Sequence, residues 1–272
     1  MADTTPILSA TILIVRDAPG LQVFMAKRHH QIDFASGALV FPGGKVTEDD
    51  RDPRWADRID GELGDLQVAA IAAVRETFEE SGLLLCRHEG DRGIGQPLIG
   101  SSEAEGLSGH RNAVDRGEES FRELLQRAGL VVALDCLRPF AHWITPVFMP
   151  KRFDTHFFVA EAPSGQHAAH DGREVTDSTW IAPSAALTLA EKNEATILFP
   201  TRLNLEVLAD CASAAQAMET ADRQIVPIMP VIEMRDGEEW LTIPTDAGYR
   251  THSVRLAAER PGKSVSRLEQ GA

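Results

Sequence analysis

Hydrophobic and β-branched residues mark four stretches of strand length in this chain. Two lie near its start, at residues 7–15 and 21–26, and the turn Asp17-Ala18-Pro19-Gly20 between them predicts a hairpin. A third stretch, 151–160, follows Trp143-Ile144-Thr145-Pro146 and is rich in aromatic and β-branched residues, which predicts a central strand. The fourth, residues 174–181, predicts another strand.

Residues 66–83 read LQVAAIAAVRETFEESGL and predict one helix of roughly five turns. The stretch has no Pro or Gly before Gly82, which lies where a helix end favours a left-handed residue. Ile71, Val74 and Phe78 recur at helical spacing and form a stripe that can pack on a core. Further helices are expected to open at Pro183, where the missing N–H costs nothing, and near residues 201–210 and 212–221.

Two stretches between these elements lack the apolar patterns that are typical of strands and helices. Residues 48–65 are charged and contain Pro53 and Gly61, so we expect an exposed loop or short helix over the site and not a core element. Residues 91–117 are rich in Gly, Ser and charge without periodicity, which predicts a mobile surface excursion. We therefore predict a domain at 7–211, with insertions at about 48–65 and 88–130, and a helical, Pro-rich extension at 212–272 whose end is disordered.

Composition narrows the class of protein. Of the 272 residues 43% are hydrophobic, enough for a core, and 41 acidic against 27 basic residues give a formal net charge of −14. This charge argues against binding to duplex nucleic acid or to an anionic membrane, so an anionic substrate would be held locally, by metal and a few cations. The three widely spaced cysteines and the lack of a leader or long apolar span predict a cytoplasmic protein. The sequence does not indicate an oligomeric state.

Three carboxylates gather on the second half of the predicted helix. Glu76, Glu79 and Glu80 project away from the apolar stripe, so we expect them on one solvent-facing patch. Glu76 and Glu80 lie four residues apart and repel each other, and Arg75 can reach Glu79 but cannot neutralise all three. Such a cluster is either a solvated helix face or a site for a hard divalent cation such as Mg²⁺, which takes oxygen ligands.

The sequence around this cluster resembles the Nudix box, the family pattern G-x5-E-x7-R-E-U-x-E-E-x-G-U in which U is a bulky apolar residue. The segment Phe41-Pro42-Gly43-Gly44-Lys45 lies ahead of it, and its glycines let the backbone approach a ligand closely. The matching residues are Gly44, Arg75-Glu76, Glu79-Glu80 and Gly82-Leu83.

The match departs from the family pattern at three points. More residues separate Gly44 from Arg75 than the pattern permits, which indicates an insertion. The first glutamate of the pattern corresponds to Asp50 when counted from Gly44 and to Gln67 when counted from Arg75. Thr77 takes a position that the family usually gives to an apolar residue.

Resemblance to the Nudix family implies an α/β (α+β) fold, an α/β/α sandwich with a mixed sheet, here with helical insertions and C-terminal helices. It also implies hydrolysis of a diphosphate linkage, X-P-O-P-Y, in a small nucleoside diphosphate derivative, with Mg²⁺ or Mn²⁺ as cofactor. The implied metal ligands are Glu76, Glu79, Glu80 and the carbonyl of Gly44. Either Glu79 or Glu76 would be the general base, with Arg75 orienting the glutamates and Gly43 and Gly44 against the substrate.

Coenzyme A or an acyl-coenzyme A is one candidate substrate. Coenzyme A hydrolases of the Nudix superfamily carry the pattern L-L-T-x-R-[S/A]-x3-R-x3-G-x3-F-P-G-G, and Gly37 and Arg28 match it when counted back from Phe41. Three positions depart from it: Ala26, His29 and Asp33.

A second likeness involves the predicted central strand. Trp-Ile-Thr-Pro followed by Arg152-Phe153-Asp154-Thr155 is similar to the branch of the superfamily that includes the peroxisomal coenzyme A diphosphatases. Arg152, Asp154 and His156 would then be either substrate contacts or strand ends. The alternative substrates are a nucleotide sugar, NADH or ADP-ribose, and the alternative to an enzyme is a non-catalytic module that binds a nucleotide.

Overall fold

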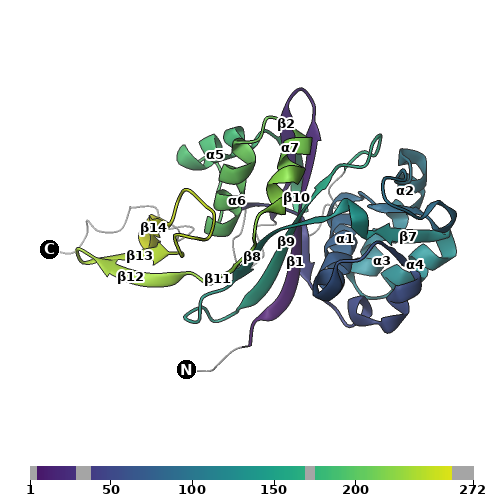
Figure 1. The fold of residues 1–272 in the computed structure, drawn as a ribbon, viewed down its shortest axis with the longest axis horizontal. Helices are drawn as coiled ribbons and strands as arrows, with labels where there is room; N and C mark the ends of the chain where they lie inside the picture. The colour runs from purple at the N-terminus through teal and green to yellow at the C-terminus, as the bar shows by residue number, and fades with distance from the viewer. Residues whose placement is uncertain (1–4, 29–37, 169–174, 259–272) are drawn as a thin grey trace.

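The structure, a computed structural model, describes residues 5–28, 38–168 and 175–258. Its centre is a mixed sheet of eight strands in the order β10-β2-β1-β9-β8-β11, with β3 beside β2 and β4 beside β1 (Figure 1). The strands are β1 (Ile7–Asp17), β2 (Leu21–Arg28), β3 (Leu39–Val40), β4 (Gly43–Lys45), β8 (Arg138–Ile144), β9 (Phe153–Glu161), β10 (Val175–Ile181) and β11 (Pro227–Ile228). β1 pairs antiparallel with β2 and parallel with β9, which confirms the predicted hairpin and the predicted central strand.

Helices cover both faces of this sheet. Along β1, Ile12 and Ile14 belong to the core that holds α1 (Gln67–Ser81), whereas Leu13 and Val15 belong to the core that holds α6 (Phe199–Ala209) and α7 (Ala214–Glu219). Successive residues of a strand point to opposite faces, so an almost continuously apolar strand suits a sheet buried on both sides. The predicted α/β/α sandwich is thereby confirmed, and α5 (Pro183–Glu191) opens at Pro183 as predicted.

Helix α1 is shorter and more deeply buried than predicted. It has 15 residues, about four turns, and Gly82 ends it with φ +75° and an N–H that donates to the Phe78 carbonyl at 2.9 Å. From Ala69 to Ser81 every residue except Glu76 is buried. The prediction that the glutamates of this helix lie on a solvent-facing patch is therefore wrong.

A second layer explains this burial, because it lies against the side of α1 that faces away from the central sheet (Figure 1). Its helices are α2 (Ser101–Leu107), α3 (Arg111–Asp115) and α4 (Phe121–Ala128), and its small sheet has the order β5-β7-β6, with β5 (Ile59–Asp60), β7 (Leu130–Ala133) and β6 (Cys86–His88). Phe121 of α4 stacks on Phe78 of α1, with ring centroids 5.6 Å apart.

Both segments predicted to be surface insertions contribute to this layer. Residues 48–65 hold two 3₁₀ turns, Asp49–Arg51 and Pro53–Asp57, and the buried Trp55 donates its ring N–H to the Asp49 carbonyl at 2.8 Å. Residues 91–117 include α2 and α3. Residues 48–65 thus hold short helices, as one of the two alternatives predicted, but the prediction that they lie outside the core is wrong. Residues 91–117 hold helices that the lack of periodicity did not indicate and contribute to the same core, and their mobility stays a prediction.

The C-terminal residues continue the fold. β11 pairs with β8, and α7 lies in the core that also holds α6. β12 (Val231–Arg235), β13 (Glu238–Thr242) and β14 (Ser253–Arg255) form a three-stranded sheet. Asp236 and Gly237, with φ +49° and +81°, make the turn of the hairpin between β12 and β13. The boundary at 211/212 stays a prediction, and the last residues, 259–272, lie outside the described residues.

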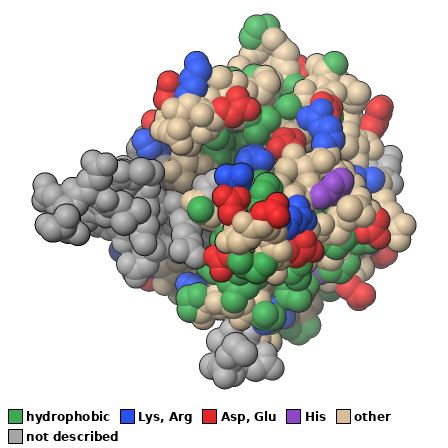
Figure 2. Space-filling model, turned by 90° about the vertical axis from the view of Figure 1, so that its left-hand side faces the viewer, with side chains coloured by type: hydrophobic (Ala, Val, Ile, Leu, Met, Phe, Trp, Pro, Cys, Tyr) green, Lys and Arg blue, Asp and Glu red, His purple; other side chains and the backbone are tan. Residues whose placement is uncertain are grey.

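Acidic and basic side chains are intermixed on the face that carries this C-terminal sheet (Figure 2). They include the exposed pairs Arg235–Glu233 and Arg255–Glu238. Within the described ranges, no helix combines the length and the apolar character needed to cross a bilayer.

Candidate active site

The two glycines of β4 lie close to β1 and to α1. Gly44 pairs with Ala10, and a Cβ on Gly44 would stand 2.3 Å from Glu76 Oε1. A Cβ on Gly43 would stand 2.4 Å from the Ala10 carbonyl oxygen. The Gly43 N–H donates to Glu80 Oε2 at 3.1 Å. At Gly43 an added Cβ would meet backbone atoms, so only glycine fits there, whereas at Gly44 it would displace the Glu76 carboxylate. Backbone and carboxylates therefore meet in one place.

Arg75 is the centre of the site. Its guanidinium donates to Asp50 Oδ1 and Oδ2 at 2.8 and 2.9 Å, to Glu76 Oε1 at 3.0 Å, and to Glu79 Oε1 at 2.9 Å. It also donates to the Lys45 carbonyl at 2.8 Å. All five donors of a guanidinium have a fixed planar geometry, so this one side chain joins the β4 loop to the helix and sets the position of three carboxylates.

Of the two residues that counting places at the first acidic position of the box, Asp50 bonds Arg75. Its carboxylate is buried, pairs bidentately with Arg75, and accepts from the Thr47 N–H at 2.7 Å and hydroxyl at 2.9 Å. Thr77, at the usually apolar position, is also buried, and its hydroxyl donates to the Ala73 carbonyl one turn back at 2.8 Å. Asp50 and Thr77, which depart from the family pattern, thus both have hydrogen-bond partners within the fold.

Burial sets the electrostatics of these groups. Glu79 is 5% and Glu80 8% exposed, and Glu76 is the most accessible of the three, with a side chain 14% exposed. Burial raises the pKa of Glu79 to about 8; the Arg75 charge opposes this rise and the Glu76 charge adds to it. Burial alone disfavours the charged Arg75, but its bonds to Asp50 and the charges of Glu76, Asp50 and Glu79 raise the pKa of Arg75 above its ordinary value.

These donors fit a hard divalent cation. Asp50, Glu76 and Glu79 share the single positive charge of Arg75, and Glu80 adds a further carboxylate beside Gly43. A buried excess of carboxylate oxygens that raises a neighbouring pKa is stabilised by a cation with a preference for oxygen. The group is therefore suited to a divalent cation.

The predicted substrate residues lie in different places. Arg28 is the last residue of β2, and its side chain and Gly37 lie outside the described residues. Arg152 is buried ahead of β9 and donates to the Thr145 carbonyl at 3.0 Å. His156 of β9 and Gly44 of β4 both pair with Ala10 of β1, so they lie in one row across the sheet. Arg152 precedes His156 by four residues, which is roughly 13 Å along the strand from that row. Its contacts are those of a strand end, and a substrate contact by Arg152 stays a prediction.

A second cluster, His142, Asp154 and His156, was only partly foreseen. The sequence singled out Asp154 and His156 but not His142, because His142 reaches them only through the antiparallel pairing of β8 with β9. His142 Nε2 lies 2.5 Å from Asp154 Oδ1, and the rings of His142 and His156 stack with centroids 4.1 Å apart. Burial and the neighbouring His142 lower the pKa of His156, and Asp154 opposes this.

This fold is shared with a solved Nudix structure. The structure titled as a NUDIX hydrolase from Alicyclobacillus acidocaldarius superimposes with a TM-score of 0.67 and 28% sequence identity, over 80% of this chain and 98% of that one. Residues 59–208, more than half of the chain, match the family described as the NUDT19 Nudix domain. The chain therefore belongs to the NUDT19 Nudix domain family.

Curated relatives of this family are similar over most of the chain. The acyl-coenzyme A diphosphatase NUDT19 of Xenopus laevis is 28% identical over 204 residues, which cover 61% of this chain and 54% of that protein. The protein of the same name from Gallus gallus is 25% identical over 244 residues, which cover 68% of this chain and 63% of that protein. The chain thus matches less than two thirds of the length of either relative.

Proposed function

We propose that this protein is a metal-dependent Nudix diphosphatase that hydrolyses an X-P-O-P-Y linkage. One observation carries the proposal: Arg75 draws Asp50, Glu76 and Glu79 together, Glu76 lies against Gly44, and Glu80 accepts from the Gly43 N–H. Family membership and the names of the relatives support the same chemistry.

In this proposal each residue has a separate task. Glu76, Glu79 and Glu80, with the carbonyl of Gly44, hold Mg²⁺ or Mn²⁺, which when bound neutralises phosphate charge and lowers the pKa of the attacking water. Arg75 is a positioning residue, because it is buried and bonded to carboxylates. Glu79 or Glu76 accepts the proton of the water. The pKa of Glu79, about 8, lies near neutral pH, and Glu76 is the more accessible of the two.

The proposed substrate is coenzyme A or an acyl-coenzyme A. Two relatives are named as acyl-coenzyme A diphosphatases, and Arg28 and Gly37 match part of the coenzyme A pattern. The alternatives within the same chemistry are a nucleotide sugar, NADH or ADP-ribose, because substrate choice resides in loops whose sequence carries no general code.

Product analysis by mass tests the proposal. Coenzyme A, an acyl-coenzyme A, NADH, ADP-ribose and nucleoside triphosphates would be incubated with the protein and Mg²⁺ or Mn²⁺, with chelator controls. Release of 3′,5′-ADP and a phosphopantetheine supports the full proposal. Metal-dependent cleavage of another diphosphate keeps the enzyme and changes the substrate, and tight binding without cleavage favours the non-catalytic module.

Replacing Glu80 tests the metal-binding role. We expect Glu80→Gln to lower turnover by roughly a hundred- to ten-thousand-fold with the fold intact, because a charged ligand is lost and a neutral amide of equal size replaces it. Initial rates and circular dichroism measure the two effects. The control Glu191→Gln, at an exposed position on α5, should retain wild-type turnover. Wild-type turnover in Glu80→Gln would remove Glu80 from the site.

A further inference from the structure

The cluster of His142, Asp154 and His156 follows from the register of two central strands. His142 of β8 stands directly opposite His156 of β9, and Asp154 precedes His156 by two residues, on the same face of β9. Their possible ligand atoms lie within 4.8 Å of one another. Side chains from two strands therefore converge at one point of the sheet.

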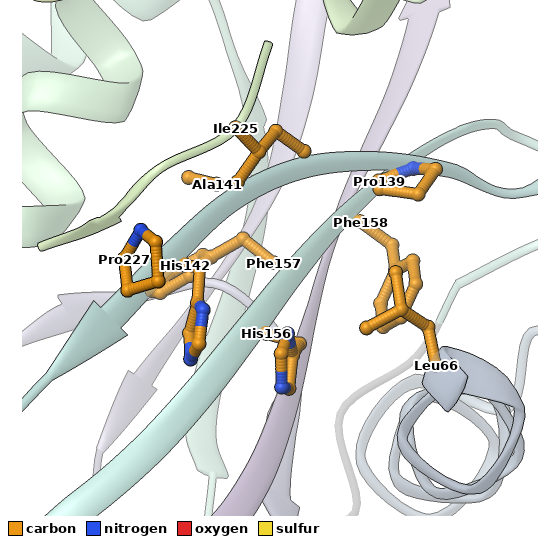
Figure 3. Close-up of a pocket in the computed structure, with 9 residues that line it drawn as sticks. All are labelled: Leu66, Pro139, Ala141, His142, His156, Phe157, Phe158, Ile225 and Pro227. Atoms are coloured by element: carbon orange, nitrogen blue, oxygen red, sulfur yellow. The ribbon is translucent and has the colours of Figure 1, made fainter. Parts of the chain in front are cut away.

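This point is separate from the carboxylate site but lies on the same sheet face. His156 pairs with Ala10, and Ala10 pairs with Gly44, so two strand spacings, roughly 10 Å, separate the His156 and Gly44 backbones. The side chains of His142 and His156 extend to the same side of the sheet, and Leu66 at the start of α1 lies across from them (Figure 3).

We propose that His142, Asp154 and His156 bind a divalent transition-metal ion of the Zn²⁺ class, at a second site distinct from the glutamates. Two imidazoles and one carboxylate are the ligands that Zn²⁺ and its neighbours prefer, whereas Mg²⁺ selects oxygen. The two sites of the molecule thus differ in the cation that they take, because their donor atoms differ.

The geometry needs only side-chain rotation to accept the ion. Tetrahedral bonds of about 2.0–2.1 Å place ligand atoms roughly 3.3 Å apart. The contact between His142 Nε2 and Asp154 Oδ1 has to lengthen from 2.5 Å, and none of the other separations exceeds 4.8 Å. The backbone positions are already set by the β8–β9 ladder.

The surroundings leave room for a fourth ligand. His142 and His156 line a cavity of about 200 Å³, whose other walls include Leu66, Pro139, Phe158 and Ile225. Three protein ligands beside a cavity leave one coordination position for water or an anionic oxygen. The His142 and Asp154 side chains are 17% and 33% exposed, so the ion can enter from solvent.

Cobalt spectroscopy tests this site without any turnover. Metal-free protein would be titrated with Co²⁺ in the presence of excess Mg²⁺, which occupies the oxygen site. We expect the strong visible absorption of four- or five-coordinate Co²⁺ at one equivalent, and its loss on addition of Zn²⁺. His142→Gln and His156→Gln should each weaken Co²⁺ binding by at least about a hundredfold.

Matched controls separate this site from ordinary histidine pairs and from the carboxylates. His88 and His110 also lie beside a glutamate, Glu103 and Glu119, so His88→Gln and His110→Gln should bind Co²⁺ as the wild type does. The hydrolytic variant Glu80→Gln should retain the absorption as well. Failure of the proposed hydrolase function would therefore not affect this result.

A second measurement avoids the risk that a variant fails to fold. In wild-type protein, Zn²⁺ should shift the ring-nitrogen NMR signals of two histidines, and circular dichroism would monitor the fold of each variant. Weak absorption typical of six-coordinate, all-oxygen Co²⁺, or equal binding by His142→Gln, would overturn the proposal. The cluster would then be a hydrogen-bonded His142–Asp154 pair with His156 stacked on it.

Discussion

At the scale of single residues, Arg75 determines whether the site can exist. Its side chain is 6% exposed and bonds Asp50, Glu76 and Glu79, so these three carboxylates depend on the same cation. Exposed pairs such as Arg116–Glu118 contribute about 0–1 kcal/mol, whereas breaking a buried pair costs about 3–5 kcal/mol. The charge balance of this cluster therefore affects both stability and metal binding.

Glu79 should make the stability of the metal-free protein depend on pH. The pKa of Glu79 in the folded protein, about 8, lies above its value of about 4.3 in an unfolded chain, so the folded protein binds the proton more tightly. The stabilisation is complete below about pH 4.3 and is lost as the pH rises through about 8. As the pH rises from about 4.3 to about 8, we expect the unfolding free energy of the wild type to fall relative to that of Glu79→Gln. Urea unfolding in the presence of chelator measures both values.

The same experiment has an exposed counterpart. Glu191→Gln replaces a glutamate on the surface of α5 and should follow the wild-type curve at every pH. Parallel curves for wild type and Glu79→Gln would contradict the raised pKa. Added Mg²⁺ should abolish the difference in slope, because a cation stabilises the ionised carboxylate.

At the scale of elements, the short strand β4 and the helix α1 form one unit. β4 is held by β1 on one side, and Glu76 reaches over Gly44 on the other. The helix is rigid because it lies between the central sheet and the second layer, and its aromatic contact with α4 is part of that second layer. The precision of the carboxylates therefore comes from packing on both sides of α1.

Gly44→Ala should impair metal binding more than folding. The new Cβ would overlap the Glu76 carboxylate, which is the movable end of a flexible side chain, so Glu76 shifts and the backbone does not. We expect the Mg²⁺ concentration for half-maximal turnover to rise about 10- to 100-fold, with an unfolding free energy within about 1 kcal/mol of the wild type.

Gly106→Ala is the matched control for that substitution. Gly106 lies in helix α2 with no atom within 4 Å of an added Cβ, so the change should leave Mg²⁺ dependence unaltered and raise stability slightly. An unchanged Mg²⁺ requirement in Gly44→Ala would show that Glu76 does not act at this position.

At the scale of the whole molecule, the C-terminal residues pack in the core that holds α6 and α7. Tyr249 is 5% exposed; its hydroxyl donates to Asn204 Oδ1 of α6 at 2.6 Å and accepts from the Trp143 ring N–H of β8 at 3.2 Å. One hydroxyl thus connects three segments that are far apart in sequence. We infer from this that residues 212–258 unfold together with the rest of the chain.

Tyr249→Phe tests that cooperativity. The substitution leaves two buried polar groups without their partner, so we expect the unfolding free energy to fall by about 2–4 kcal/mol in a single transition. Tryptophan fluorescence and circular dichroism would follow urea unfolding. Ser108→Ala, which removes an exposed hydroxyl bond to the Glu105 carbonyl, should cost less than about 1 kcal/mol. An early separate transition, with the main one unmoved, would instead support a boundary at 211/212.

The sequence by itself determined the features that depend on neighbouring residues. Gly82 ends α1 and Pro183 opens α5, because φ preferences and missing donors act locally. The spacing of Arg75, Glu76, Glu79 and Glu80 similarly identified the box. Those residues do lie together, and the roles of the three glutamates as metal ligands stay predictions.

Tertiary structure alone decided what surrounds those residues. Asp50 reaches Arg75 across 25 positions, and His142 meets His156 only through strand pairing. Trp55 is buried because a second layer packs on α1, and the same layer converts a helix face predicted to be solvated into a buried one. Burial and long-range pairing depend on how distant segments pack, which no local pattern of polar and apolar residues specifies.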